Sequence, residues 1–427
     1  FRTVLAISSS LPDGTRLDAE RRVELERRAL EWGRRGVRVL GVASRRLRAG
    51  DLPELSAERE LVFQGFVTFL DRPKAGVANA IATLAARGVQ VKIITGDSRP
   101  VAEYVAQLIA LPGRRVLTGS ELDSLSEEAL WRRAEDTELF VEVDPNHKER
   151  IIRALKKAGH VVGFLGDGVN DAPAMHVADV SLSVDQAVDV ARATADLVLL
   201  EPGLDVIRRG IEEGRKTFAN TLKYVLTTTS ANLGNMVSMA LASLFLPFLP
   251  LLPGQILLNN FLSDIPALGL ADDRVDVELV NAPRRWDIRF VGRFMLEFGA
   301  LSSLFDCITF AVLLLAFNAS IDTFRTGWFI ESLLTELVIA IIIRTRRPFF
   351  RSRPGRLLSV ATLVLIPLTL ALPFLPHARL LGFVPLQAPI LAALVAITMV
   401  YVATAELTKA WFYRQTGRSS RAQTLRG

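Results

Sequence analysis

The sequence is poor in cysteine and lacks a recognisable targeting signal. Its 427 residues include one cysteine, Cys307, so no disulfide can form within the chain and nothing indicates an oxidising compartment. The first residues, Phe1-Arg2-Thr3, include no methionine and begin no basic-then-apolar pattern, so we expect that the start of the protein is missing. Half of the residues are apolar, which is too many for an ordinary cytosolic enzyme.

The apolar residues are concentrated in the second half of the chain. Long apolar blocks predict six membrane-spanning helices, at residues 222–246, 251–270, 291–317, 328–343, 357–376 and 386–406. The second block is broken by Pro253, Pro266 and Gly269, and broken helices are tolerated in a bilayer where they line a cavity or pack within protein. An even number of spans returns the C-terminus to the side of the soluble half. We expect that side to be the cytoplasm and the spans to lie in the plasma membrane.

The formal net charge is +6, and much of the excess follows membrane topology. A run of arginines separates two apolar blocks: Arg344, Arg346, Arg347, Arg351, Arg353 and Arg356. The tail after Trp411 is also basic. Because lysine and arginine are enriched in cytoplasmic loops, we interpret this charge as a sign of topology, with a lipid bilayer and no nucleic acid as partner.

The first half alternates between predicted strands and amphipathic helices. Strands are expected at residues 37–42, 61–70, 89–94, 139–143, 160–165 and 180–184, and helices at 18–35, 76–86, 100–109 and 148–157. Near-continuous apolar strands separated by helices are typical of a doubly wound α/β domain with a buried parallel sheet. We expect this domain at 62–204, after a domain remnant at 1–61 and before a helical stalk at 205–221, a transmembrane domain at 222–412 and a basic tail at 413–427. Residues 205–246 read as one helix, which would transmit movement to the membrane.

The strongest chemical signal lies at residues 166–174, Gly-Asp-Gly-Val-Asn-Asp-Ala-Pro-Ala, directly after a predicted strand. Ligands bind at the carboxyl ends of parallel strands in this architecture. Glycines there let the backbone approach a phosphate, and carboxylates hold the magnesium that neutralises it. Asp167, Asn170 and Asp171 are therefore candidate ligands, since a simple helix N-cap would explain one aspartate but not two with an asparagine beside them.

Two other segments meet the same edge of the predicted sheet. Thr95, Gly96 and Asp97 follow a strand and offer a hydroxyl and backbone amides to a phosphoryl oxygen, although this pattern is also common at helix N-caps. Lys148 lies near the start of a helix and can supply a positive charge to the phosphoryl group. A single lysine at such a position is usually only solvated. The prediction of a phosphoryl site therefore depends on the three segments taken together.

In this order and at these junctions, the motifs resemble the haloacid-dehalogenase-like phosphoryl-transfer site of P-type ATPases. Residues 166–174 match that family's hinge signature, and residues 71–74, Asp-Arg-Pro-Lys, are a variant of its entry motif. The resemblance implies that Asp167 and Asp171 hold the catalytic Mg²⁺, and that Asn170 orients the phosphoryl group. It also assigns Thr95, Gly96, Asp97 and Lys148 to the catalytic site.

The same resemblance implies ATP and Mg²⁺ as cofactors. Residues 1–61 would end a nucleotide-binding domain, in which Arg38 resembles the arginine that reaches the ATP phosphates, and Asp71 would belong to the cofactor-binding residues. The sequence Asp-Lys-Thr-Gly-Thr, whose aspartate is the nucleophile of this family, is absent. We therefore expect this chain alone to be inactive, with the nucleophile in a missing N-terminal half of the same pump.

The first two predicted spans carry oxygen-bearing side chains that cost several kcal/mol each if they face lipid. They are Asn232, Asn235, Asn259, Asn260, Ser263 and Asp264. Asn232 and Asn235 are three residues apart, as are Asn260 and Ser263, so each pair lies on one helix face. Two converging faces of this kind suit a hard cation such as magnesium or calcium. Asparagines also join membrane helices by hydrogen bonds, so the hypothesis of an ion site depends chiefly on Asp264 beside Pro266.

Later predicted spans contain further acids. We rank Glu331 next as a contact for the transported cation, and we expect Asp306 to pair within the helix bundle. Glu336 and Glu406 are expected to have structural roles.

Several stretches resemble the bacterial magnesium-transporting branch of the family, at residues 162–167, 293–295, 302–306 and 327–331. This resemblance implies an ATP-driven pump that imports Mg²⁺ through an aspartyl-phosphate intermediate, of which the chain would be the C-terminal half. Two alternatives stay open. One is a pump for Ca²⁺ or another divalent cation, and the other is a non-catalytic membrane half-protein that binds a partner or senses magnesium.

Overall fold

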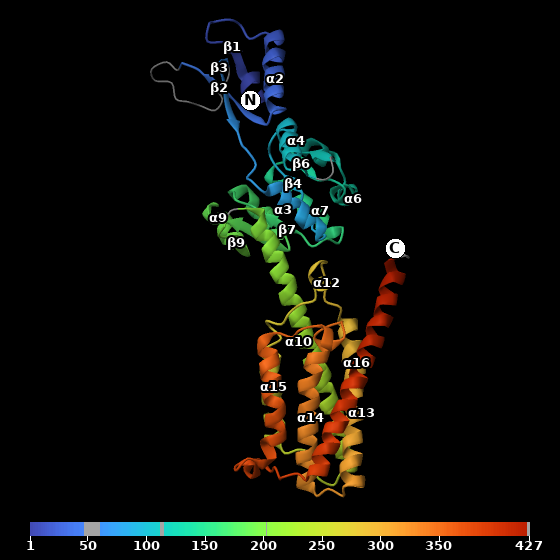
Figure 1. The fold of residues 1–427 in the computed structure, drawn as a ribbon. Coiled ribbons are helices and arrows are strands. Elements are labelled where there is room, and N and C mark those ends of the chain that lie inside the picture. The colour runs from blue at the N-terminus through green and yellow to red at the C-terminus, as the bar shows by residue number, and fades with distance from the viewer. Residues whose placement is uncertain (47–59, 112–114, 202, 425–427) are drawn as a thin grey trace. The chain divides into compact units, whose positions relative to one another are not determined.

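The computed structural model describes residues 1–46, 60–111, 115–201 and 203–424. The chain divides into two compact units, Phe1–Gly210 and Ile211–Gly427 (Figure 1). The described strands all belong to the first unit, and the described part of the second consists of helices and their connections. Residues 425–427 of the predicted basic tail lie outside the described residues.

A small mixed sheet begins the first unit. Its central strand β3 (Leu61–Leu70) lies parallel to β1 (Ser8–Ser10) and antiparallel to β2 (Val37–Ser44). Helix α1 (Arg2–Ile7) precedes β1, and α2 (Ala19–Gly33) connects β1 to β2. The strand predicted at residues 61–70 is therefore present, but it pairs in this sheet and not with the parallel strands where we expected it.

Two parallel three-stranded sheets follow in the first unit. One has the order β4-β6-β5, with its strands at Ile93–Ile94, Leu139–Val141 and Val116–Thr118. The other has the order β7-β8-β9, with its strands at Gly163–Leu165, Val180–Val184 and Leu197–Leu199. Parallel strands that alternate with helices agree with the predicted α/β architecture. In the described residues these strands form two separate sheets and not one continuous sheet, because no strand pairing joins them.

Strands β4 and β7 each lie at an edge of their sheet. Each is hydrogen-bonded to a neighbouring strand on one side only, β4 to β6 and β7 to β8. Both are also shorter than expected, since the ladders hold only Ile93–Ile94 and Gly163–Leu165. An apolar run predicts a buried strand, but the length of the ladder depends on a partner that the run does not specify.

The helices of the first unit pack around the parallel sheets. They are α3 (Val77–Ala86), α4 (Arg99–Leu108), α5 (Gly119–Ser124), α6 (Glu127–Glu135), α7 (Pro145–Lys157), α8 (Ala172–Val177) and α9 (Asp189–Thr194). Helix α7 begins where Asp144 Oδ1 accepts the His147 N–H at 2.8 Å, with Pro145 in the first turn. Lys148 is consequently held in the first turns of a well-capped helix. The apolar face of α7, including Ile151, is buried in the core with Phe140.

The second unit is a bundle of helices. Its main members are α10 (Leu204–Phe245), α11 (Pro253–Leu268), α13 (Ile288–Ala311), α14 (Ile321–Ile343), α15 (Arg356–Ala371) and α16 (Ala388–Thr424), with a short α12 at Val277–Val280. Helix α10 is continuous, as its pattern predicts. It begins within the first unit and continues into the second.

Four helical segments of the described chain are long and apolar enough to cross a membrane: Ile288–Ala316, Ile321–Ile343, Arg356–Phe374 and Ala388–Gln415. They correspond to the last four predicted spans. The first two predicted spans coincide with the second half of α10 and with α11. Helix α10 is long enough but is not among the segments that are apolar enough, and α11, with 16 residues, is too short by the same criteria. The finding therefore supports a membrane helical domain, and the number of spans stays a proposal.

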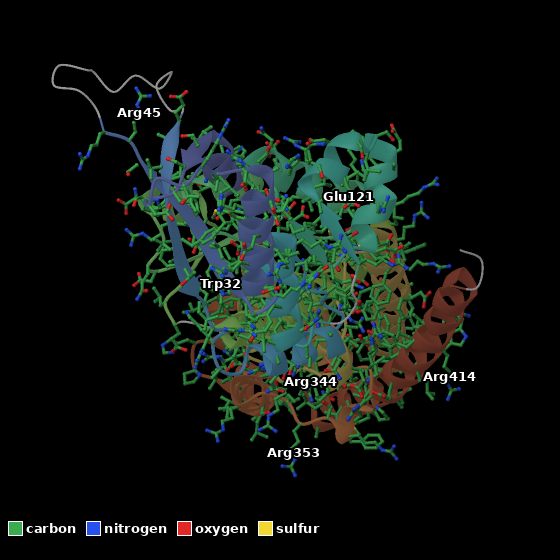
Figure 2. All side chains as sticks on the ribbon, turned by 90° about the horizontal axis from the view of Figure 1, so that it is seen from above. Trp32, Arg45, Glu121, Arg344, Arg353 and Arg414 are labelled. Carbon is green, nitrogen blue, oxygen red and sulfur yellow. The ribbon has the colours of Figure 1, made fainter. Side chains whose placement is uncertain are left out.

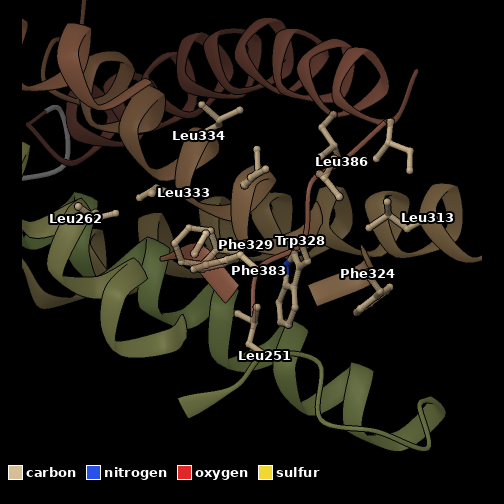
Figure 3. Close-up of a cluster of buried hydrophobic side chains, with 14 of the residues drawn as sticks. Leu251, Leu262, Leu313, Phe324, Trp328, Phe329, Leu333, Leu334, Phe383 and Leu386 are labelled. Carbon is tan, nitrogen blue, oxygen red and sulfur yellow. The ribbon is translucent and has the colours of Figure 1, made fainter. Parts of the chain in front are cut away.

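Helix α14 forms much of the core of the bundle. Trp328, Phe329 and Leu333 on this helix are at most 1% exposed, and Figure 3 shows them with Phe383 and Leu251 from other segments. Burial on nearly all sides of a helix is expected at the centre of a bundle. Polar side chains on α14 are consequently held within an apolar surrounding.

One end of the bundle contains a buried ion cluster. Asp273, in the loop after α11, accepts hydrogen bonds from Lys223 of α10 at 2.7 Å and from Arg344 at 3.1 Å. The Gly355 N–H also donates to its carboxylate at 2.7 Å. Arg344 is buried, whereas Arg353 of the same basic run is exposed (Figure 2). The carboxylate thus ties together three segments that are distant in the sequence.

Candidate functional site

The end of β7 and the start of α7 meet through an ion pair. Lys148 Nζ lies 2.6 Å from Asp171 Oδ1, and the two side chains are 17% and 10% exposed. The other oxygen, Asp171 Oδ2, accepts the backbone N–H groups of Asp167 at 3.2 Å and Gly168 at 3.1 Å. A Cβ added to Gly166 would lie 2.6 Å from the Asp171 Cβ, so this turn requires a glycine there. The predicted pairing of Lys148 with the 166–174 motif is therefore present in the geometry.

Asp167 and Asn170 occupy a different position in the same turn. Both are exposed, and within the described residues the Asp167 carboxylate has no hydrogen-bond or ion-pair partner. Asp171, in contrast, already makes three such contacts. The geometry favours Asp167 as the carboxylate that can bind a metal ion and Asp171 as the residue that holds the turn and Lys148 in place.

The segment after β4 approaches the same region. Thr95 is half-buried and its Oγ1 accepts the Asp97 N–H at 3.1 Å, while Gly96 is exposed. The Val143 N–H, directly before the cap of α7, donates to the Thr95 carbonyl at 3.3 Å. The end of β4 is therefore fixed beside the helix that carries Lys148.

Arg38 of β2 contacts the same segment. Its Nε lies 2.9 Å from Asp97 Oδ1, and its Nη1 lies 3.5 Å from Oδ2 of Asp71, the residue directly after β3. Arg38 and Asp71 are half or more exposed, so these contacts are accessible to competition by another anion. The two predicted cofactor-binding residues are thus brought together with Asp97.

The arrangement can bind a phosphoryl group and its counterion. An exposed carboxylate and a hydroxyl follow the ends of parallel strands, where phosphoryl-transfer sites are built, and a partly buried lysine lies beside them at the start of α7. Mg²⁺ keeps most of its waters and takes one or two protein carboxylates together with phosphate oxygens, which fits Asp167. The described residues contain no group of three or more acidic, histidine or cysteine side chains that could hold a metal ion.

A second polar group lies in the helix bundle. Asn235 of α10 and Asn259 of α11 both donate their Nδ2 to Oε1 of Glu336 on α14, the latter at 3.1 Å. Ser263 of α11 lies beside the same carboxylate. Of the residues predicted to bind the transported ion, the structure thus brings Asn235 and Ser263 together, around an acid to which we had given a structural role.

The other predicted ion ligands of α10 and α11 point elsewhere. Asn232, Asn260 and Asp264 are exposed on the surface of the second unit. In the described part of the chain, none of the three forms a hydrogen bond with Glu336. They are thus separate from Asn235 and Ser263, which lie beside Glu336.

Glu331 is buried one helical turn before the inner group. It is 1% exposed, lies beside Asp306, and its Oε2 has no hydrogen-bond partner among the described atoms. Asp306 accepts hydrogen bonds from Trp328 Nε1 at 2.7 Å and Ser238 Oγ at 2.5 Å. The expectation that Asp306 pairs within the bundle is confirmed. Glu406 pairs with a lysine, Lys409, at 2.9 Å.

The sequence reasoning missed Glu336 and gave Asn259 no role of its own. Glu336 is five residues after Glu331, and the sequence does not reveal which face of a uniformly apolar helix meets α10 and α11. The sequence offers one signal, the spacing of Ser332 and Glu336, because residues four apart lie on the same helix face. In the structure this face does meet α10, where the Ser332 hydroxyl donates to Asn235 Oδ1 at 3.4 Å.

Two protein families match different parts of the chain. The family described as "haloacid dehalogenase-like hydrolase" matches residues 14–179, and that described as "Cation transporting ATPase, C-terminus" matches residues 248–411. The first match includes the sheet β4-β6-β5, strand β7 and the 166–174 motif, and it ends just before β8 (Val180–Val184). The second covers the helix bundle from just before α11.

Individual relatives are similar over most of the chain. The "Magnesium-transporting ATPase, P-type 1" of Salmonella typhimurium and that of Escherichia coli are each 43% identical over 391 residues, which is 90% of this chain and 43% of the relative. The endoplasmic reticulum calcium ATPase of Aspergillus fumigatus is 35% identical over 309 residues, 67% of this chain and 31% of that protein. The chain thus spans less than half the length of these relatives. The chain belongs to the P-type cation-transporting ATPases and is similar to their bacterial magnesium-transporting branch.

Proposed function

We propose that this chain is the C-terminal part of a longer pump that uses ATP to import Mg²⁺. The observation that carries the proposal is the Lys148–Asp171 pair with the free Asp167 carboxylate beside it. In the working pump, ATP and Mg²⁺ bind at this edge, with Arg38 and Asp71 among the nucleotide contacts. Lys148 stabilises the charge of the transferred phosphoryl group, and Thr95 hydrogen-bonds to one of its oxygens.

The nucleophilic aspartate lies in a segment outside this chain. The edge positions of β4 and β7 support this assignment, since in the described part of the chain each strand is paired on one side only and each is followed by one of the motifs predicted to bind phosphate. A parallel strand between them would place its own carboxyl end, and an aspartate there, between Thr95 and Asp167. This chain alone would then bind phosphate but form no aspartyl phosphate.

The transported cation binds among the oxygen-bearing side chains of α10 and α11. Asn232, Asn235, Asn260, Ser263 and Asp264 supply amide, hydroxyl and carboxylate oxygens, which suit a hard divalent cation. Glu331 on α14 is a further contact. Helices α10 and α11 complete a set of six spans in the plasma membrane, with the first unit and the C-terminus in the cytoplasm.

Movement is transmitted along α10. This helix is continuous from Leu204, in the phosphorylation domain, to Phe245, beyond Asn232 and Asn235. A change at the phosphoryl site that rotates or shifts this helix would alter the ion ligands that it carries.

The test is cation-stimulated ATP hydrolysis by the complete protein in proteoliposomes. Mg²⁺ supplied on the side opposite to ATP is expected to stimulate hydrolysis, and Asp264→Asn is expected to abolish the stimulation. Stimulation by Ca²⁺ in place of Mg²⁺ would favour a calcium pump, for which the similarity to calcium ATPases is a specific reason. No stimulation by any divalent cation would favour the non-catalytic alternative and contradict the proposal.

A further inference from the structure

His147 caps the start of α7 through two hydrogen bonds. Its Nδ1 accepts the Asp144 N–H at 3.1 Å, and its own backbone N–H donates to Asp144 Oδ1 at 2.8 Å. This reciprocal arrangement is a capping box, in which the third helical residue is usually glutamate or glutamine. A histidine differs from both because its ring carries a second nitrogen that the cap does not use.

The second ring nitrogen of His147 contacts another helix. Nε2 lies 2.8 Å from Oδ1 of Asp123 on α5, and His147 is buried, at 8% exposed. Because a backbone N–H can only donate, Nδ1 must accept from Asp144, and the proton of the neutral ring lies on Nε2, where it donates to Asp123. A glutamate would serve the cap equally well, but it has no proton to donate to Asp123. The histidine therefore connects the start of α7 to α5.

The backbone before α7 is held in place as well. Glu142 has a positive φ of 55°, which is a costly conformation for a residue other than glycine. Its N–H donates to the Asp97 carbonyl at 3.0 Å, and a Cβ added to Gly119 would lie 2.3 Å from its carbonyl oxygen. The turn between β6 and α7 is thus fixed against both the Asp97 segment and α5.

We propose that His147 and Asp123 form a positioning pair, which holds the first turn of α7 so that the Lys148 ammonium group stays at the phosphoryl site. Lys148 directly follows His147, and its N–H donates to the Asp144 carbonyl at 3.2 Å. The turn that His147 caps therefore sets where the Lys148 side chain begins, and its Nζ then lies 2.6 Å from Asp171 Oδ1. The pair acts through Lys148 and not on the phosphoryl group itself. This inference deepens the proposed function and rests on it.

The test is Mg²⁺-stimulated ATP hydrolysis by the complete protein, with kcat and the KM for ATP measured separately. Asp123→Ala removes the bond to the ring and leaves the cap of α7 intact, because His147 and Asp144 are unchanged. Asp123→Asn keeps an oxygen that accepts the Nε2–H. Glu135→Ala is the matched control, since Glu135 pairs with His160 at 3.4 Å, just beyond the other end of α7.

Asp123→Ala is expected to lower kcat by at least about threefold, because a small displacement of a charged group weakens its stabilisation of the transition state. The KM for ATP is expected to stay within about twofold of the parent value. Asp123→Asn and Glu135→Ala are expected to keep kcat within about twofold. Equal kcat in Asp123→Ala and the parent would overturn the positioning pair, and so would an equally large fall in Asp123→Asn.

A double-mutant cycle separates action through Lys148 from a purely structural role. His147→Ala and Lys148→Ala are measured singly and together. If His147 acts through Lys148, the double variant loses no more activity than Lys148→Ala alone. Losses that multiply in the double variant would overturn the proposal.

Competitive acetylation of Lys148 without ATP, measured by mass spectrometry, tests the pair in the absence of catalysis. The Lys148 side chain is 17% exposed, so a looser first turn is expected to raise its labelling at least about threefold in Asp123→Ala and not in Glu135→Ala. Unchanged labelling in Asp123→Ala would overturn the positioning pair. Absence of Mg²⁺-stimulated hydrolysis in the parent would instead contradict the proposed function, and the labelling would still decide the role of the pair.

Discussion

Replacing Asp171 by alanine tests whether this residue organises the phosphoryl-binding turn. The change removes the ion pair with Lys148 and the acceptor for two backbone N–H groups, those of Asp167 and Gly168. Hydrogen bonds to charged groups contribute about 1.5–3 kcal/mol each, and removing one partner of a buried pair costs about 3–5 kcal/mol. Since these contacts overlap and are slightly exposed, we expect a total local loss of about 3 kcal/mol.

Hydrogen–deuterium exchange of the complete protein gives the assay. A local loss of about 3 kcal/mol corresponds to roughly 100-fold faster exchange for the amides of Asp167 and Gly168. Peptides that cover residues 163–175 report this change directly. Asp171→Asn, which keeps the shape and part of the hydrogen bonding, is expected to fall between Asp171→Ala and the parent.

The matched control is Asp167→Asn in the same turn. Asp167 is exposed and its side chain has no partner among the described residues, so its replacement should leave the exchange of these peptides unchanged. Exchange in Asp171→Ala within about threefold of the parent would refute the assignment of Asp171 as the organising residue.

Three further variants follow from other contacts. Asp273→Asn leaves Lys223 and Arg344 buried without a charged partner, so we expect it to destabilise the protein by about 3–5 kcal/mol. The loss is measured as a lower melting temperature in detergent, and an unchanged melting temperature would contradict the role of this cluster. Arg38→Ala breaks only half-exposed contacts, so we expect no change in melting temperature. The KM for ATP is expected to rise about tenfold. A lower melting temperature with an unchanged KM would contradict a role of Arg38 in the nucleotide site. The pKa of Glu121 is lowered because the Thr118 N–H donates to its carboxylate. The stabilisation that ionised Glu121 gives the folded state is therefore present above the usual pKa of a glutamate and is lost as the pH falls through the lowered pKa. In denaturation curves measured over a series of pH values, Glu121→Gln should weaken the dependence of stability on acid pH. An unaltered pH dependence would refute this role of Glu121.

The candidate phosphoryl site could be proposed from sequence because each of its segments carries a local signal in the chain. Asp167 and Asp171 lie in one motif, and the cap at Asp144 fixes the start of the helix that carries Lys148. The pairing of strands could not be predicted in the same way. Apolar runs indicate strands, but only the folded chain shows that β3 pairs with β2.

The ion-binding residues show the limit of helical spacing. Spacing places Asn232 with Asn235 and Asn260 with Ser263, but each helix face is broad, and the structure divides both pairs between an exposed and an inner side. The inner side is defined by Glu336 on α14, which lies 101 residues from Asn235 in the sequence. Such a contact depends on tertiary packing, which periodicity within one helix does not specify.

Phosphorylation of the complete protein by γ-labelled ATP tests the central claim, that this edge of the parallel sheets holds a phosphoryl group and its metal ion. The account predicts an acid-stable, hydroxylamine-sensitive phosphoenzyme in the parent and none in Asp167→Asn. A phosphoenzyme that forms equally in both proteins would contradict it.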